Sequence, residues 1–537
     1  MKRILIIIAC ILTTLNMDAQ QQEYIRLTTD KNCYLAGEDI WLKICVSDKD
    51  NQPLNISKVA YIEVSDSQQV YAQAKLDLTE GMGNGRIRLP RTMHSGAFQL
   101  TAYTRYMRNW GEKAYQRQLI AVINTLQSSE EDRMKWTDSL PETNIASSNK
   151  LNTDQKEYNP RSKVNLSWNN VPADAFGLSL SVVRMDYALE PIATSVVPAH
   201  VGRMTSTIWI PESEGHIVSA KVVQGNTNLK TSRLGCVGND IRIFEGKNTA
   251  EGIFTYYTHD IYNQQDIAID AVSHEWSTDK SRMEIISPFT GTLPQTLLTL
   301  HLYSQAQALQ ERSVNMQIQA LLPDSTNNGS VMESLYNFTP YMTYNLDEWT
   351  RFTTVREMLV EFVMGIRVTK RNGHDIMLLL KEDAKKFSNF KSLVLIDGVP
   401  VENHEQVLDY DARLLQYLHQ YRGSYTFGGQ VYDGIISMIT HKANLNGLRL
   451  EENATLLAYE FPQKNIQFPA NRYETEKQKS SRIPDFRHTL YWNPLLNQTS
   501  GSIDFYTSDM KGTYVATLKG YTEKGDAWEE KVQFIVK

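Results

Sequence analysis

Residues 393–442 read LVLIDGVPVENHEQVLDYDARLLQYLHQYRGSYTFGGQVYDGIISMITHK, and they say more about the fold than any other stretch. The run Leu393–Ile396 predicts a buried strand, because short apolar runs bounded by turn residues are typical of strands with two covered faces. A tight turn should follow at Asp397 and Gly398, since glycine accepts positive φ. Pro400 lacks an amide proton and should end the ladder.

The second half of the stretch predicts the partner of that strand. Apolar residues continue through Leu414, Leu415 and Leu418, and Gly428 and Gly429 then lead into a second apolar run at 435–439. The stretch as a whole predicts a small β-α-β unit closed by a glycine-rich turn.

This pattern resembles the plug domain of bacterial TonB-dependent outer-membrane receptors. That family has a strand ending in DGVP, a helix, a Tyr- and Gly-rich turn, and a strand of the form GxIxxxT. The residues that carry the match are Asp397, Gly398, Val399, Pro400, Gly428, Gly429 and Gly434.

The upstream sequence extends the resemblance. Thr354–Glu357 predicts a capping box that opens a helix with apolar positions spaced from Val355 to Val363. Gly365 should end this helix, and a short strand should follow at 366–368. Residues 376–386 depart from the family, which usually has an IxIRG turn there.

The resemblance covers residues 350–443. A plug normally sits in a barrel of about 22 strands, each about 10 residues long. Only 95 residues follow Lys442, so we expect no self-contained transporter. The resemblance implies an outer-membrane protein or a TonB-dependent receptor as a partner, with the ligand unknown.

The N-terminus predicts a signal peptide over residues 1–19. Lys2 and Arg3 precede an apolar run from Ile4 to Leu15, and Ala19 suits a cleavage site. Lipidation at Cys10 is the alternative. No later window is apolar enough for a membrane-spanning helix. We expect an exported protein in the periplasm, the outer membrane or the cell surface of a Gram-negative bacterium.

Composition narrows the class of protein. The chain is 41% hydrophobic and 22% charged, with a net charge of −6, so nucleic acid is not expected as a partner. Length predicts three to five domains. After signal removal Cys33, Cys45 and Cys236 remain, and a Cys33–Cys45 disulfide and three free thiols both stay open.

Residues 20–125 predict a β-sandwich. Thr29–Lys43 has the form TDKxxYxxGExIxxK, which resembles the opening of macroglobulin-type domains. Ile40, Leu42 and Ile44 alternate with Trp41, Lys43 and Cys45 in this stretch, and the pattern leaves the buried face undecided. The thioester motif of macroglobulin protease traps is absent, since Cys236 lies in LGCVG. The module should therefore act as a scaffold.

The remaining chain completes a mainly β, multidomain fold, with Ig-like or macroglobulin-like β-sandwiches and one small α+β plug-like domain. Strands at regular intervals predict a sandwich at 214–300, and a further β-rich segment is expected at 159–213. For the segment 446–537, a C-terminal sorting signal is the alternative to a β-sandwich. The other predicted segments are a linker at 126–158, a helical connector and loop at 301–349, and a C-terminal β-sandwich at 446–537.

No catalytic motif, metal-ligand spacing or cofactor fingerprint is present, so we expect no enzyme, no metal and no cofactor. Asp397 is interpreted as a turn residue rather than an acid catalyst. An aromatic cluster near the glycine turn predicts either a binding surface or a cover for the small sheet. Its members are Tyr417, Tyr421, Tyr425, Phe427 and Tyr432.

Together these patterns favour a non-enzymatic, exported binding or scaffold protein at the outer membrane, a domain combination that resembles envelope proteins of Bacteroidota. An accessory of a TonB-dependent uptake system is the first alternative. An adhesin or secreted surface protein is a more remote one, and an enzyme without recognisable motifs is the last.

Overall fold

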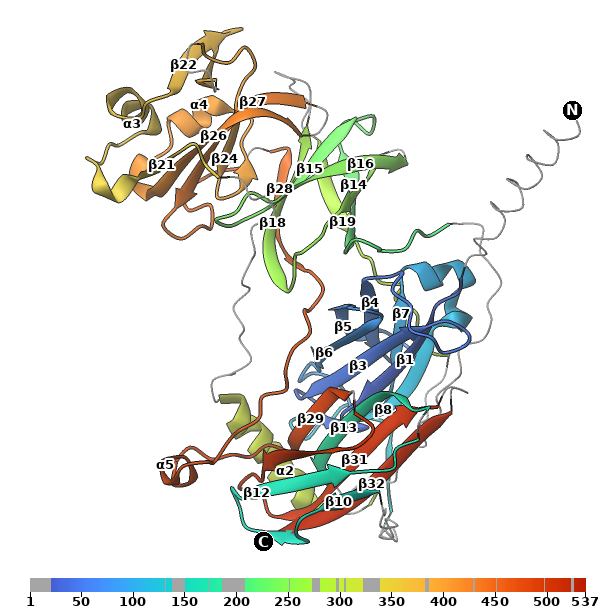
Figure 1. Ribbon diagram of the computed structural model, residues 1–537. Coiled ribbons are helices and arrows are strands. Elements are labelled where there is room, and N and C mark those ends of the chain that lie inside the picture. The colour runs from blue at the N-terminus through green and yellow to red at the C-terminus, as the bar shows by residue number, and fades with distance from the viewer. Residues whose placement is uncertain are drawn as a thin grey trace, which may run out of the picture. The chain divides into compact units, whose positions relative to one another are not determined.

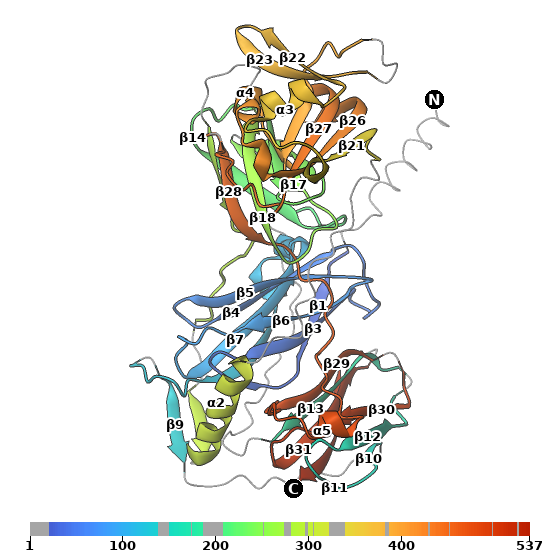
Figure 2. The same cartoon turned by 90° about the vertical axis from the view of Figure 1, so that its left-hand side faces the viewer.

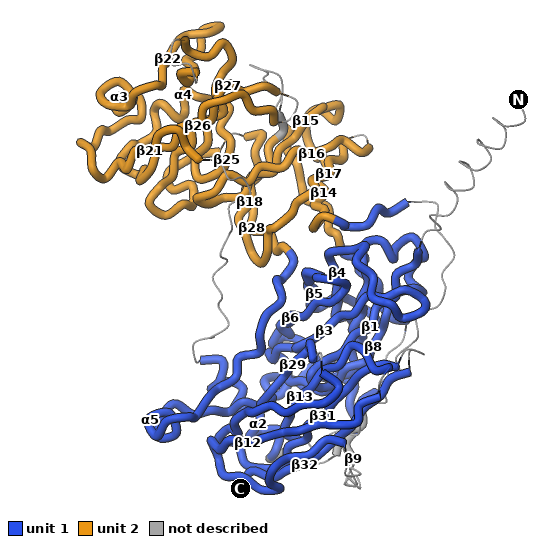
Figure 3. The backbone as a smooth tube through the Cα atoms, viewed as in Figure 1, with its two compact units in different colours: residues 1–213, 289–329, 462–537 blue, residues 214–288, 330–461 orange. Residues whose placement is uncertain are grey.

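The computed structural model describes residues 21–537 except 131, 138–149, 173, 186–207, 251, 273–280, 296–298, 304–305, 322–338, 382–385, 428–429, 451, 497 and 523–525. The predicted signal peptide, including Cys10, lies outside the described residues. Strands predominate, which confirms the mainly β, multidomain class (Figure 1). The chain divides into two compact units: unit 1 contains residues 1–213, 289–329 and 462–537, and unit 2 contains 214–288 and 330–461 (Figure 3).

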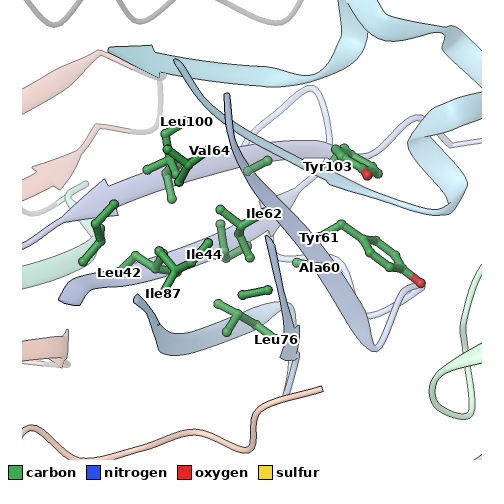
Figure 4. Close-up of a cluster of buried hydrophobic side chains, with 14 of the residues drawn as sticks. Leu42, Ile44, Ala60, Tyr61, Ile62, Val64, Leu76, Ile87, Leu100 and Tyr103 are labelled. Atoms are coloured by element: carbon green, nitrogen blue, oxygen red, sulfur yellow. The ribbon is translucent and has the colours of Figure 1, made fainter. Parts of the chain in front are cut away.

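Unit 1 begins with a β-sandwich. One sheet has the order β1 (Tyr24–Thr29), β3 (Asp39–Ser47), β6 (Met82–Arg88). The other has the order β2 (Cys33–Leu35), β8 (Gln116–Ile123), β7 (Gly96–Thr104), β4 (Val59–Ser65), β5 (Val70–Asp77). Two short 3-10 helices, η1 (Tyr106–Trp110) and η2 (Glu112–Ala114), connect β7 to β8. Apolar side chains of both sheets, including Leu42, Ile62 and Leu100, meet in one core (Figure 4).

Strand β3 buries both of its faces. Leu42 and Ile44 lie fully buried in the sandwich core. Lys43 and Cys45 on the opposite face are also buried, because β13 of the next sandwich lies against them: a Cβ added at Gly177 would be 3.3 Å from Cys45 Sγ. Alternation could not choose a face because both are covered.

A second sandwich in unit 1 combines two distant parts of the chain (Figure 2). One sheet has the order β10 (Leu151–Thr153), β12 (Lys163–Trp168), β30 (Gly501–Tyr506). The other has the order β11 (Glu157–Tyr158), β32 (Ala527–Val536), β31 (Gly512–Tyr521), β13 (Phe176–Arg184), β29 (Thr489–Leu496). The sheets enclose one core that includes Leu166, Leu180 and Phe534.

This arrangement corrects two predicted boundaries. Residues 446–537 do not form a sandwich alone, because their strands from Thr489 onward pair with 151–184. The predicted linker 126–158 contains β10, β11 and also β9 (Met134–Thr137), which pairs with β20 (Leu300–Tyr303). Strand alternation identifies a strand but not its partner, and here the partners are remote.

Helices α2 and α5 complete the described part of unit 1. Helix α2 (Ala306–Leu321) lies within the predicted connector and packs Leu309 against Leu35 and Ile123 of the first sandwich. The short α5 (Glu476–Lys479) opens with a capping box between Thr475 and Gln478. The helix expected in this connector is therefore present, and it packs on the first sandwich.

Unit 2 contains one seven-stranded sheet. Its order is β19 (Arg282–Ile286), β14 (Ile217–Gln224), β17 (Ile253–Tyr257), β16 (Ile243–Ala250), β15 (Thr231–Cys236), β18 (Gln264–Val272), β28 (Ala454–Glu460). The end strands β19 and β28 meet, and Thr455 Oγ1 donates to the carbonyl of Met283. The predicted sandwich 214–300 is thus a rolled sheet that takes its last strand from beyond residue 450.

Residues 339–450 form an α+β domain within unit 2. Its main sheet has the order β21 (Met342–Asn345), β26 (Leu415–Phe427), β27 (Gln430–Thr440), β24 (Leu393–Ile396), β25 (Val399–Pro400). The rest of the domain consists of a hairpin and four short helices. The hairpin is formed by β22 (Ile366–Arg371) and β23 (His374–Leu379), and the helices are η3 (Leu346–Glu348), α3 (Val355–Glu361), α4 (His404–Leu408) and η4 (Ala412–Leu414).

The local predictions for this domain hold in part. The capping box of Thr354 and Glu357 is confirmed, and β24 and β27 are parallel neighbours, as a β-α-β unit requires. The helical part is shorter than the plug pattern suggests: α4 has five residues, and 415–427 forms a long strand that pairs with β27. The apolar spacing at 414–418 reflects this strand together with the turn before it.

Cys33, Cys45 and Cys236 are all free thiols, so the structure selects this alternative over a disulfide. Within the described parts of the chain, no helix combines the length and the apolar character that crossing a membrane requires.

Candidate functional site

The macroglobulin-type motif at 29–43 connects separate segments of unit 1. Its Asp30 is buried, and its carboxylate accepts hydrogen bonds from the Tyr34 hydroxyl (2.8 Å) and the Trp41 amide (3.2 Å). The Thr489 hydroxyl at the start of β29 also donates to Asp30 (2.9 Å). Asp30 thus ties the motif's own turn to the C-terminal part of the chain.

Glu38 binds helix α2 in the same way. It follows Gly37, whose φ of 96° places the turn in a conformation that favours glycine. The carboxylate of Glu38 contacts Arg312 of α2 (2.8 Å) and Lys31 (3.1 Å). Burial alone would raise the pKa of Glu38, but the charges of Arg312 and Lys31 outweigh it and lower this pKa to about 2.

Lys43 provides a third connection. Its ammonium donates to the carbonyl of Leu178 in β13 (2.9 Å), and burial lowers the pKa of this amine. The three charged residues Asp30, Glu38 and Lys43 therefore hold β29, α2 and β13. The motif works in this chain as an internal assembly point.

A pocket of about 280 Å³ opens beside this assembly point, inside unit 1. The motif's turn, strands β3 and β6, the second half of α2 and the segments 468–471 and 486–489 surround it. Its lining residues are Lys31, Gly37, Glu38, Asp39, Trp41, Arg86, Arg88, Arg312, Asn315, Met316, Gln319, Ala320, Phe468, Pro469, Asn471, Phe486, Arg487, His488, Thr489 and Met510.

Cations outnumber carboxylates in this lining. Asp39 is bound by Arg88 (Nη2 to Oδ2, 2.9 Å) and by Arg86 (3.4 Å), so it faces two guanidinium groups, just as Glu38 faces two cations. Arg487 is paired outside the lining with Asp485 (2.7 Å), and Asp30 lies 3.9 Å from Lys31. With both of these outer carboxylates counted, the pocket retains one positive charge in excess.

The rest of the lining mixes aromatic rings and side-chain amides. Trp41 and Phe468 meet edge to face, with ring centroids 5.0 Å apart. Phe486 lies on another part of the wall, where its amide donates to Gln319 (3.3 Å). Amides both donate and accept hydrogen bonds. The pocket can therefore bind an anionic group through its cations, the face of a ring through its aromatic side chains, and hydroxyl groups through its amides.

The predicted aromatic cluster lies in unit 2, on β26 and β27. Tyr421, Tyr425 and Phe427 pack with Ile241 and Ile243 of the rolled sheet, half-buried. The structure therefore brings these three side chains together as a cover between the α+β domain and the rolled sheet.

Of the other two aromatic residues, Tyr432 belongs to this same cluster, opposite Tyr425 in the register of β26 and β27, whereas Tyr417 lies outside it. Tyr432 is buried, and its hydroxyl donates to Glu402 (3.1 Å) and Gln430 (2.7 Å). Tyr417 is half-buried beside His419, with ring centroids 5.8 Å apart. Ligand contact through any of the five aromatic residues stays a prediction.

The DGVP residues form a turn that packs on the rolled sheet. Asp397 and Gly398 have φ of 46° and 79°, and the carboxylate of Asp397 accepts from the Thr440 amide and hydroxyl and the Leu445 amide (2.7 Å each). Asp397 thus stabilises a loop of the domain, in agreement with its interpretation as a turn residue.

Contacts around the DGVP turn are too close for larger side chains. A Cβ at Gly398 would lie 2.7 Å from the carbonyl of Cys236, and Pro400 approaches Gly235. Val399 is buried in the domain core. Gly434 has φ of 89° and lies against Leu379, whereas Gly428 and Gly429 lie outside the described residues.

A network of charges, which the sequence did not reveal, connects the α+β domain to the rolled sheet. Arg233 of β15 is 1% exposed and binds Asp270 of β18, Glu402 (2.8 Å) and the hydroxyl of Tyr432 (3.0 Å). Lys391 binds Glu402 in turn. Burial would raise the pKa of Glu402, but Arg233 and Lys391 outweigh it and lower this pKa well below its usual range. Two cations meet two carboxylates, so the network is neutral.

In the parts of the chain that the structure describes, no group of three His, Cys, Asp or Glu side chains is placed to hold a metal ion.

Comparisons with known proteins add little to this geometry. No family model and no curated protein matches the chain. Among solved structures, alpha-2-macroglobulin from Escherichia coli in its native conformation is 10% identical at a TM-score of 0.23, and the match covers 97% of this chain and 40% of that one.

Two further structures show likeness at the same level or below. Salmonella alpha-2-macroglobulin reacted with methylamine is 9% identical at a TM-score of 0.23, covering 96% of this chain and 39% of that one. Latent PorU from Porphyromonas gingivalis is 8% identical at a TM-score of 0.15, covering 96% and 34%. The chain spans about 40% of the length of the E. coli protein. Likeness at these TM-scores carries no conclusion about function, and the β-sandwich architecture rests on the sheets themselves.

Proposed function

We propose that this protein is a non-enzymatic, exported binding and scaffold protein of the cell envelope. One observation carries the proposal: Asp30, Glu38 and Lys43 bind three separate segments of unit 1 and leave an open, charged pocket beside them. A framework held together by fixed charges around an open pocket is suited to binding.

The neutral network of unit 2 supports a fixed role for the α+β domain, which resembles a receptor plug in sequence. Its DGVP turn lies against Cys236 and Gly235, and Arg233 joins it to the rolled sheet through Glu402. These contacts occupy the surface that carries the plug motif. They favour a domain that is part of a scaffold over one that inserts into a barrel of another protein.

A second candidate, an accessory component of a TonB-dependent uptake system, has one observation in its favour. Large apolar side chains are exposed on and beside α3: Trp349 is 45% exposed, Met364 70% and Val360 77%. Exposed apolar residues of this size are typical of protein-binding surfaces. A receptor could bind the α+β domain there.

The experiment that separates the two candidates uses affinity-tagged full-length protein from gently solubilised envelopes. The scaffold function predicts recovery in the envelope fraction without a reproducible β-barrel partner. The accessory function predicts a barrel receptor that is lost in Val360→Ser/Met364→Ser and retained in the matched surface variant Ile483→Ser, whose side chain is 63% exposed in unit 1. Recovery only in the soluble cytoplasmic fraction would contradict both candidates.

A further inference from the structure

We infer that the pocket between Glu38, Asp39 and α2 binds an acidic saccharide, that is, a sugar carrying a carboxylate group. The inference rests on the proposed binding function and names its ligand class.

The charge on the pocket favours an anionic group. Arg88 holds Asp39 through Nε and Nη2, yet 56% of its side chain is exposed, and Arg86 beside it is 27% exposed. Guanidinium groups bind carboxylates with directional, paired hydrogen bonds. At this rim the guanidinium groups of Arg86 and Arg88 both face the carboxylate of Asp39. A ligand carboxylate would give these two cations a second anionic partner.

The other lining residues match a sugar ring. Phe468 and Phe486 are half-buried and border the cavity, where the C–H face of a ring can pack against an aromatic side chain. The amides of Asn315, Gln319 and Asn471 can donate to and accept from hydroxyl groups. At about 280 Å³ the cavity is near the lower end of small-molecule sites, which span about 300–1,000 Å³, so it suits the end of a chain or a short oligosaccharide.

A peptide is a poorer match because the nearby sheet edge is already occupied. Strand β6 is the end strand of its sheet and borders the pocket. The Arg86 amide donates to Gln463 Oε1 (3.0 Å), and the Arg86 carbonyl accepts from Gln463 Nε2 (2.8 Å). An extended peptide therefore lacks the backbone partners that it would use to add a strand here.

The test is calorimetric titration of the purified full-length protein at low salt with three acidic probes: a galacturonate trimer, a glucuronate-containing disaccharide and sialyllactose. We expect saturable binding of at least one probe. The trimer's methyl ester and lactose serve as uncharged counterparts and should bind at least tenfold more weakly than the matching acids. Binding should weaken in 0.5 M NaCl, because salt screens exposed charges.

Variants with opposite expected effects sharpen the test. Arg88→Gln should weaken binding of the acid at least tenfold, whereas Asp39→Asn should strengthen it several-fold by releasing two guanidinium groups. Arg413→Gln is the matched control, because Arg413 holds Asp411 through Nε and Nη2 (2.8 Å each), is 59% exposed and lies in unit 2. It should leave binding unchanged.

Several outcomes would overturn the inference: no binding of any acidic probe, equal binding of acid and uncharged counterpart, or insensitivity to Arg88→Gln. Equal or tighter binding of inorganic phosphate or an acidic peptide would also overturn it. The co-purification experiment tests the proposed function separately. If the protein is recovered in the envelope fraction but binds none of the three probes, this inference is refuted and the proposed function is not.

Discussion

The pocket of unit 1 and the charge network of unit 2 are built from the same parts and differ in balance. In unit 2, Arg233 and Lys391 meet Asp270 and Glu402, and every charge is matched. In unit 1, the carboxylates of Glu38 and Asp39 each face two cations beside an open cavity. The difference teaches that balanced, covered charges hold two parts of a chain together, whereas an excess of cations over carboxylates beside a cavity leaves capacity for an anionic ligand.

The largest expected effect breaks the matched network. Arg233→Met should destabilise unit 2 by about 4 kcal/mol, because removing one partner of a buried pair leaves uncompensated charge. Hydrogen exchange of β15 and β18 during denaturant titration would measure it. Arg282→Met is the control in the same unit, since Arg282 is 60% exposed and its ion pair with Glu284 is long, at 4.0 Å. It should change stability by less than about 0.5 kcal/mol, and equal losses in the two variants would contradict a role for the network.

The second effect tests the pocket's inner carboxylate. Glu38→Gln should cost unit 1 about 3 kcal/mol at pH 7, because the depressed pKa of about 2 corresponds to about 1.4 kcal/mol per unit below the ordinary value. A depressed carboxyl pKa stabilises the fold above the unfolded pKa of about 4.5 and loses this contribution as pH falls toward 2. The gap between the variant and the parent protein should therefore close in acid. A gap that stays constant from pH 7 to pH 2 would argue against the ion pair with Arg312.

A smaller effect concerns His404 of the α+β domain. It is buried, its Nδ1 accepts from the Met377 amide (2.9 Å), and burial lowers its pKa to about 4. In the unfolded chain this imidazole is protonated below about pH 6.5, whereas in the folded domain it stays neutral down to about pH 4. The free energy of unfolding should therefore fall by about 2 kcal/mol from pH 7 to pH 5.

The variant His404→Asn keeps an acceptor without a titrating group. It should remove most of this slope in unit 2 and leave unit 1 unchanged, as followed by pH-dependent hydrogen exchange of each unit. An unaltered slope would assign the acid sensitivity to another group.

The smallest expected effect on stability completes the comparison. Arg88→Gln should change the stability of unit 1 by less than about 0.5 kcal/mol, since exposed ion pairs contribute little. Thermal unfolding would measure it alongside the ligand titration. A stability loss as large as that of Glu38→Gln would place Arg88 in the framework rather than in the pocket.

Features set by neighbouring residues could be predicted from the sequence. The capping box of Thr354 and Glu357 and the turn at Asp397 and Gly398 follow from side-chain and backbone chemistry within a few residues. Thr29–Lys43 marked a sandwich because its turn and strand are contiguous. Such signals need no knowledge of distant partners.

Features set by distant partners could not be predicted. Residues 415–427 carry aromatic and polar side chains that suit a strand only once β21 and β27 flank them. Arg233 lies in an ordinary strand sequence, and only the register of β15 beside β18 places it opposite Asp270. The pocket escaped detection for the same reason, since Arg88, Arg312 and Phe486 come from three separate regions.

The second sandwich of unit 1 has a consequence for how the chain is made. Strand β13 ends at Arg184, but both of its neighbours, β29 and β31, begin at or after Thr489. During synthesis β13 emerges long before these strands, while all of unit 2 lies between them in the sequence and can fold first. Until β29 and β31 have been synthesised, the apolar side chains of β13 stay exposed. We therefore expect this protein to depend on a chaperone that binds the incomplete chain.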